Sequence, residues 1–215
     1  MKRHLYLMID TETAGNLDNP IVYDLGLAVV DRLGEVYETH SLVIKEIWEN
    51  LELLKTAYYS EKLPNYLKQL LLNERELVTF KQAQYIVNGL CEKYNIKAIV
   101  AHNAIFDYKA LKNTQRFINN EYYFLPQDIE IWDTLKMARS VITTKKSYQK
   151  FCHEHSFLTK HKNPRPQASA EVLYRYISQN PSFIESHTGL EDCMIEKDIL
   201  AYCFKQKKKM QKKLF

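Results

Sequence analysis

Five residues that could perform chemistry fall in three separate parts of the chain. They are Asp10 and Glu12 in LMIDTETAG, Asp107 in VAHNAIFDYKAL, and His187 and Asp192 in HTGLEDCMIEKDIL. Carboxylates that converge on one point repel each other unless a positive charge lies between them. Two divalent cations supply that charge, and a pair of metals held by carboxylates suits in-line displacement at phosphorus. The pattern therefore predicts a metal-dependent nuclease.

The first acidic pair follows an apolar run, residues 4–9, with the pattern of a buried strand. Side chains two residues apart on a strand point to the same face, so Asp10 and Glu12 can reach one metal. The spacing alone is weakly specific, because Asp128 and Glu130 repeat it. The preceding buried strand and the nearby Gly15, which lets the chain turn, favour the first pair. An ordinary surface strand end is the alternative.

Asp107 is expected one turn into a helix that follows a short apolar strand. His102 and Asn103 then occupy the crossing from strand to helix, where phosphate sites of α/β folds collect. Asn103 is expected to orient this loop through side-chain hydrogen bonds. The alternative for Asp107 is a first-turn acid that is stabilised by the helix dipole.

His187 and Asp192 cannot share one helix face, because five residues place them about 140° apart. We therefore expect His187 before the final helix and Asp192 in its first or second turn. An imidazole with a pKa near ~6.5 can accept a proton at neutral pH. Taken alone, an exposed histidine without a function is the competing interpretation.

Together, the order D-x-E, H-N-x-x-F-D and H-x4-D resembles the DEDDh branch of the 3′–5′ exonucleases, from residue 5 to about 204. This family includes polymerase proofreading subunits and RNA-trimming enzymes. The sibling branch would require tyrosine where this chain has Thr188. Asp133 resembles the acid that the family places after its last strand, with a structural role.

The resemblance implies an α/β, RNase H-like fold, with a mixed five-stranded β-sheet flanked by α-helices. Four carboxylates would bind two divalent metal ions, Mg²⁺ or Mn²⁺: Asp10, Glu12, Asp107 and Asp192. His187 would be the general base. Four residues would contact the substrate: Thr11, Thr13, Asn103 and Phe106. The expected reaction releases nucleoside 5′-monophosphates from the free 3′ end of DNA or RNA.

Some residues differ from the family pattern. Gly189 and Cys193 stand where the last motif commonly has alanine, and Thr13-Ala14-Gly15 replaces the usual residues after the first motif. None of these positions carries a catalytic atom. Residues 161–186 resemble an insertion and are a candidate for substrate specificity.

Local patterns predict an alternation of strands and helices. Strands are expected over residues 4–9, 21–30, 35–44, 98–101 and 129–132, with a hairpin turn at 31–34. Helical patterns cover residues 46–73, 80–94, 104–117, 133–141, 147–155, 168–178 and a final helix from about 189. Thr79 and Gln82 have the spacing of a capping box.

Composition favours one packed domain. The chain has 215 residues, of which 46% are hydrophobic, and a formal net charge of +4. We expect an exonuclease domain over 1–204 and a lysine-rich tail over 205–215. Without the lysines of that tail, the formal charge of the chain is about −2. The tail could attract phosphate backbones or be a solvated helix end. Its lysines are at positions 205, 207, 208, 209, 212 and 213.

The remaining features concern location and partners. Four cysteines without paired spacing, and an N-terminal apolar run too short for a signal core, predict reduced thiols in a cytoplasmic protein that does not bind a membrane. The family resemblance adds a DNA polymerase or a repair protein as a candidate partner, and the sequence does not indicate an oligomeric state. The alternative function is a catalytically silent nucleic-acid-binding or scaffold protein that keeps the fold.

Overall fold

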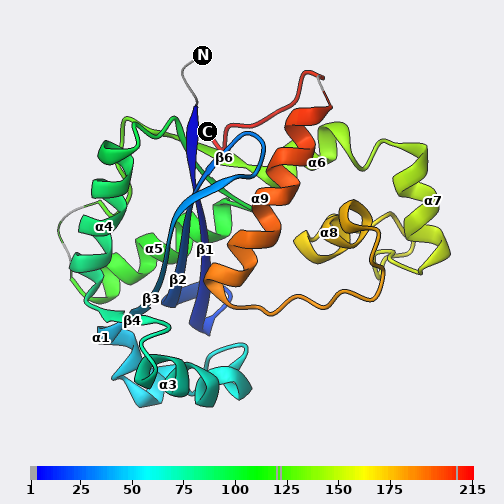
Figure 1. Ribbon diagram of the computed structural model, residues 1–215. Coiled ribbons are helices and arrows are strands. Elements are labelled where there is room, and N and C mark those ends of the chain that lie inside the picture. The colour runs from blue at the N-terminus through cyan, green and yellow to red at the C-terminus, as the bar shows by residue number, and fades with distance from the viewer. Residues whose placement is uncertain (1–3, 120, 122, 207) are drawn as a thin grey trace.

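A six-stranded sheet forms the centre of the molecule (Figure 1). The computed structural model describes residues 4–119, 121, 123–206 and 208–215. The strands are β1 (Leu5–Asn16), β2 (Asn19–Asp31), β3 (Val36–Ile44), β4 (Glu76–Val78), β5 (Ala98–Ala101) and β6 (Glu130–Asp133). The helices that follow β4 along the chain are α4 (Phe80–Lys93), α5 (Ile105–Phe117), α6 (Thr134–Val141), α7 (Lys146–Glu154), α8 (Ala170–Ser178) and α9 (Gly189–Lys205).

The strand order is β4-β3-β2-β1-β5-β6. β1 runs antiparallel to β2 and parallel to β5, β2 runs antiparallel to β3, and the pairs β5–β6 and β3–β4 are parallel. This mixed sheet flanked by helices confirms the predicted α/β, RNase H-like class. The sheet has six strands, not the five expected. The strand that was not predicted is β4, because its three residues are too few to show a period-two pattern.

β1 is longer than the apolar run predicts. It continues past Ile9 to Asn16, paired throughout with β2, with a shift of register between Glu12 and Thr13. Its pairing with β5 ends earlier, at Met8 opposite Val100. Asp10 and Glu12 therefore lie inside a strand that projects beyond its parallel neighbour. The hairpin with β2 supplies the backbone partners that extend β1 this far.

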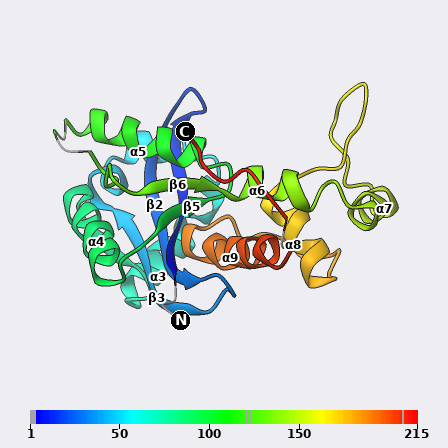
Figure 2. The ribbon, with the colours of Figure 1, turned by 90° about the horizontal axis from the view of Figure 1, so that it is seen from above.

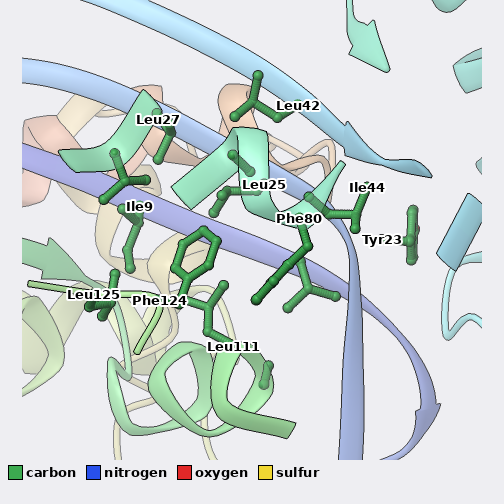
Figure 3. Packing of buried hydrophobic residues seen from close by; sticks show 14 of the residues in the cluster. Ile9, Tyr23, Leu25, Leu27, Leu42, Ile44, Phe80, Leu111, Phe124 and Leu125 are labelled. Atoms are coloured by element: carbon green, nitrogen blue, oxygen red, sulfur yellow. The ribbon is translucent and has the colours of Figure 1, made fainter. Parts of the chain in front are cut away.

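Two hydrophobic layers fix the helices on opposite faces of the sheet (Figures 1 and 2). Leu7 and Ile9 belong to the layer that packs against α4 and α5, shown in Figure 3 around Phe80 and Leu111. The alternate residues of β1, Tyr6 and Met8, belong to the layer of α6 to α9. Period-two alternation thus continues Met8 into Asp10 on the α9 side.

The segment from Lys45 to Arg75, called the arm below, is not one long helical region. It contains α1 (Lys45–Trp48), α2 (Leu51–Leu54), a 3₁₀ turn (Ser60–Lys62) and α3 (Leu63–Leu71). Asn50 caps α2 by accepting from Leu53 N, and Pro64 lies in the first turn of α3. These residues begin new helices, which explains the breaks. The arm lies at the end of the sheet where α9 begins (Figure 1).

The predicted capping box is confirmed. The capping box of Thr79 and Gln82 opens α4, with Thr79 accepting from Gln82 N. All four cysteines are free and buried. Within the described ranges, no helix combines the length and hydropathy needed to cross a bilayer.

The C-terminal residues fold back after α9 ends at Lys205 and pair with the outer edge of β6. Asp133 N donates to Lys212 O at 2.7 Å, and Leu214 N donates to Ile131 O at 2.8 Å. Lys212 Nζ also lies 4.7 Å from the ring centroid of Trp132. Lys207, which belongs to the expected tail, lies outside the described residues. Affinity of the tail for phosphate backbones stays a prediction.

Candidate active site

Asp10 and Glu12 enter the site from the projecting part of β1. They lie two residues apart, before the register shift, so the regular pleat gives both the same face. One carboxylate oxygen of each lies within 4.8 Å of the other and of an oxygen of Asp192 on α9. Two motifs separated by almost the whole chain therefore meet.

Asp107 is held at the start of α5 by β1. Its Oδ1 accepts from Thr11 N at 3.1 Å and from Thr11 Oγ1 at 2.8 Å. Because Thr11 points to the α5 side of the sheet, this pair ties the first turn of α5 to the strand between the two acids of β1. Asp107 is 2% exposed, so it is a buried acid in the first turn of α5. It also lines the cavity described below, so both interpretations of this residue hold.

The start of α9 lies directly against β2. A Cβ on Gly26 would lie 2.0 Å from the carbonyl carbon of Gly189, and a Cβ on Gly189 would lie 2.5 Å from Gly26 N. Gly189 N also donates to Asp24 Oδ2 at 2.8 Å. Gly189, which differs from the family pattern, is therefore required by this close backbone contact. The contact brings the first turn of α9, which carries Asp192, next to β1 and β2.

A buried arginine holds the same junction from the arm. Arg75 Nη1 donates to Asp24 at 3.2 Å and to Ser41 Oγ at 2.6 Å, while its Nη2 donates to Glu191 at 3.0 Å. Asp24 also accepts from Tyr66 OH at 2.6 Å. Thus the arm, β2 and α9 share one charge network, and each charged group in it has a partner.

His187 lies just before α9, as its spacing from Asp192 indicates. It adopts φ +51°, and a ring nitrogen lies within 4.8 Å of oxygens of both Asp192 and Glu185. Burial and the ammonium of Lys62 lower the pKa of His187 below its ordinary value. The imidazole is therefore neutral near pH 7, the state in which it can accept a proton.

These residues line one cavity of about 530 Å³ beside the projecting part of β1 and the end of β5. Eight of the nine residues expected from the sequence line it: Asp10, Thr11, Glu12, Asn103, Phe106, Asp107, His187 and Asp192. Thr13 does not belong to the described lining of this cavity; its carbonyl faces Tyr58 N of the arm at 3.5 Å. The geometry places these side chains together, and their individual roles stay predictions.

The loop after β5 is fixed by the acid expected to be structural. Asp133 Oδ1 accepts from Asn103 N at 3.1 Å and caps α6 by accepting from Leu135 N at 2.8 Å. His102 is held by Thr134 Oγ1 and by Ala168 O, each at 2.8 Å from a ring nitrogen. Among the described residues, the bond that orients Asn103 is therefore made by its backbone N–H and not by its side chain.

Sequence reasoning missed several residues at the cavity. Glu196 is 2% exposed and follows Asp192 by one helical turn, so a search at i+4 would have found it. Glu185 and Arg139 also line the cavity, but no local pattern marks them. The expected insertion contributes Glu185 and residues 168–170 to the wall.

Burial dominates the electrostatics of the acidic cluster, by which we mean Asp10, Glu12, Asp107, Asp192 and Glu196, and neighbouring carboxylates add repulsion. Burial, followed by the charge of Asp192, raises the pKa of Glu12 to about 9. Burial raises the pKa values of Asp107 and Asp192 to about 7 each. Burial and the carboxylates of Glu196 and Asp107 hold the pKa of Asp10 well above its usual range. The cluster thus retains protons near neutral pH unless another cation replaces them.

The donor atoms fit a hard divalent cation. Asp10, Glu12 and Asp192 offer carboxylate oxygens that converge within 4.8 Å, and no cysteine belongs to the described lining. All-oxygen donors suit Mg²⁺ or Mn²⁺ rather than a metal that prefers thiolates. The residues present therefore fit a divalent metal centre.

A larger depression, of about 600 Å³, lies elsewhere, between α5, residues 123–131 and the C-terminal residues. It contains Asp128 and Glu130, the second copy of the D-x-E spacing, and both are exposed. The pKa of Glu130 is lowered, chiefly by its bond with Lys213, in contrast to the raised values of the acidic cluster. Glu130 thus has a lysine partner, and among the described residues neither Asp128 nor Glu130 belongs to a group of converging side chains that could hold a metal.

Comparison with known proteins adds little to this geometry. No protein-family model matches the chain, and no curated protein matches it. The chain is similar to a solved structure described as exonuclease X in complex with 5′ overhanging duplex DNA, with 16% sequence identity and a TM-score of 0.46. That match covers 94% of this chain and 92% of the other. A likeness this distant assigns no function, so the interpretation rests on the residues of this chain.

Proposed function

We propose that this chain is a metal-dependent 3′–5′ exonuclease of the DEDDh type that releases nucleoside 5′-monophosphates from DNA or RNA. One observation carries the proposal. Carboxylates from β1, α5 and α9, remote in sequence, line one cavity together with a neutral histidine. A module that only binds nucleic acid has no need of a buried cluster of acids, because such a cluster repels phosphate.

Each residue has a role in this proposal. Asp10, Glu12, Asp107 and Asp192 would hold two divalent ions, which supply positive charge at the phosphodiester and make water easier to deprotonate. His187 would take the proton from the attacking water. Thr11, through its bond to Asp107, keeps that carboxylate oriented.

The substrate would enter along the open wall of the cavity. Arg139 is exposed at this wall and offers a guanidinium to a backbone phosphate. Asn103 and Phe106, from the loop before α5 and its first turn, would contact the terminal nucleotide. A DNA polymerase or repair protein as partner, and action in the cytoplasm, belong to the same proposal.

Labelled oligonucleotides test the reaction and its direction. With Mg²⁺ or Mn²⁺, a 5′-labelled single strand of DNA or RNA should give a ladder of shortened products, and a 3′-labelled strand should release labelled mononucleotide at once. EDTA should stop both. If neither DNA nor RNA is shortened with metal present, the silent binding protein is the better interpretation.

Matched variants assign the activity to this cavity. Asp10→Asn should abolish trimming, whereas Asp128→Asn, at the exposed copy of the same spacing, should leave it unchanged. His187→Ala should slow turnover by roughly 10²–10⁴-fold, the usual contribution of a general base. Full activity of Asp10→Asn would refute the assignment.

A further inference from the structure

An aromatic ring from the arm covers one face of His187. The ring of Tyr59 is stacked on the imidazole, with centroids 4.3 Å apart and an interplanar angle of 9°. The neighbouring Tyr58 contacts Tyr59 edge to face at 4.9 Å and is itself 73% exposed. Of these two tyrosines, Tyr59 packs one face of its ring against His187, whereas the side chain of Tyr58 is exposed to solvent.

A lysine one turn later holds the backbone that carries the histidine. Lys62 Nζ donates to Ser186 O, and it lies 3.5 Å from His187 O. The same ammonium lies 4.5 Å from the ring centroid of Tyr59. His187 has φ +51°, a conformation that is uncommon for residues other than glycine. Lys62 restrains this part of the backbone from the arm.

The imidazole is bounded at its edge by a carboxylate. Glu185 Oε2 lies 3.6 Å from His187 Nδ1. Glu185 N is in turn fixed by a bond to Glu171 Oε1 at 3.1 Å, on α8. With a ring on its face and a carboxylate at its edge, His187 has few rotamers left that keep both contacts.

The arm is tied to α9 independently of these contacts. Arg75, at the end of the arm, bonds both Asp24 and Glu191. Tyr59 therefore projects from an anchored segment, and its ring is a fixed surface rather than a loose one. A positioned catalytic group needs such support, because small displacements cost rate.

We propose that Tyr59 is a positioning residue that holds the imidazole of His187 in its working orientation toward the acidic cluster. This inference rests on the proposed function. It assigns the arm a part in catalysis that none of the three sequence motifs indicates, and it makes Tyr59 an aid to the histidine rather than a platform for a substrate base.

Kinetics of two substitutions test the ring. Tyr59→Phe keeps the aromatic face and should change kcat by less than about threefold. Tyr59→Leu keeps much of the volume but removes the face, and should lower kcat by about 10- to 100-fold with little change in KM. Tyr85→Leu, at an exposed tyrosine on α4, is the control and should have no effect. A loss that appears in KM alone would identify Tyr59 as a substrate contact and overturn the proposal.

A double-mutant cycle shows whether Tyr59 acts through His187. In the His187→Ala background, Tyr59→Leu should have no further effect on kcat, because the group that it positions is gone. An unchanged 10- to 100-fold loss in that background would mean that Tyr59 acts on something else, and the proposal would be wrong.

A measurement on the resting protein separates this proposal from the proposed function. In NMR spectra, the ring protons of His187 should be shifted upfield by the stacked ring in the wild type and in Tyr59→Phe, and should return toward ordinary values in Tyr59→Leu. Absence of that difference overturns the stacking. If the upfield shift is present but the wild type trims nothing, the proposed function fails, and the contact is structural and not catalytic.

Discussion

Replacing one acid of the cluster should make the metal-free protein more stable while removing its response to metal. In Asp192→Asn, the amide oxygen can still accept from Ser186 Oγ, which donates to Asp192 Oδ1 at 3.2 Å, so the hydrogen bond is kept. What is lost is a buried negative charge beside Asp10 and Glu12. Stability and activity are therefore expected to change in opposite directions.

The magnitude follows from the pKa of Asp192, which burial raises to about 7. A tenfold change in proton affinity between the unfolded and the folded protein corresponds to about 1.4 kcal/mol, so at pH 8 the ionised group costs the folded state up to about 4 kcal/mol. Neighbouring carboxylates share protons and reduce this value. We expect a gain of at least about 1 kcal/mol, which raises Tm by about 2–4 °C in a chain of this size.

Thermal unfolding followed by circular dichroism, with EDTA and then with Mn²⁺ in excess, checks both halves of this prediction. At a metal concentration about 100 times Kd, the wild type should gain about 2.7 kcal/mol, and Asp192→Asn should gain much less. Asp198→Asn, at a partly exposed acid on the same helix, is the control. A lower Tm for Asp192→Asn in EDTA, or equal responses to Mn²⁺, would refute the reasoning.

Three further perturbations probe the electrostatics and the framework. Raised pKa values mean that the folded protein binds more protons than the unfolded chain between about pH 4 and pH 9, so the Tm of metal-free protein should fall across that range, and saturating Mn²⁺ should flatten the slope. Gly189→Ala should lower Tm and turnover together, because its Cβ cannot fit 2.5 Å from Gly26 N; wild-type values for both would contradict that packing. Arg75→Met should cost about 3–5 kcal/mol in a urea titration, because it leaves Asp24 buried without its cation. In that case, a loss below about 1 kcal/mol would show that the network contributes little.

Much of this fold was predictable because its patterns are local. Apolar runs located five strands, and the capping residues Thr79 and Gln82 located the start of α4. The breaks of the arm also have local signals, because Asn50 caps α2 and Pro64 lies in the first turn of α3, but the helical pattern over residues 46–73 concealed them. The extension of β1 to Asn16 depends on the hairpin with β2, which an apolar count along one segment cannot show.

The residues of the candidate site also differ in how far the sequence could predict them. Residues that fall into motifs, such as Asp10 and Asp192, could be chosen from spacing and family resemblance. Tyr59 and Glu185 reach the histidine only through tertiary packing, and nothing in their local sequence marks them. The close contact of Gly26 with Gly189 likewise appears only when β2 and α9 are placed together.

The proposed function depends above all on the acidic cluster holding divalent metal for phosphodiester cleavage. The decisive measurement is a crystal structure with Mn²⁺, with anomalous differences recorded at a wavelength where manganese scatters anomalously. We expect two manganese peaks within coordination distance of Asp10, Glu12, Asp107 and Asp192, with His187 close by. Anomalous maps without a peak at these carboxylates, from crystals soaked in excess Mn²⁺, would contradict the proposal.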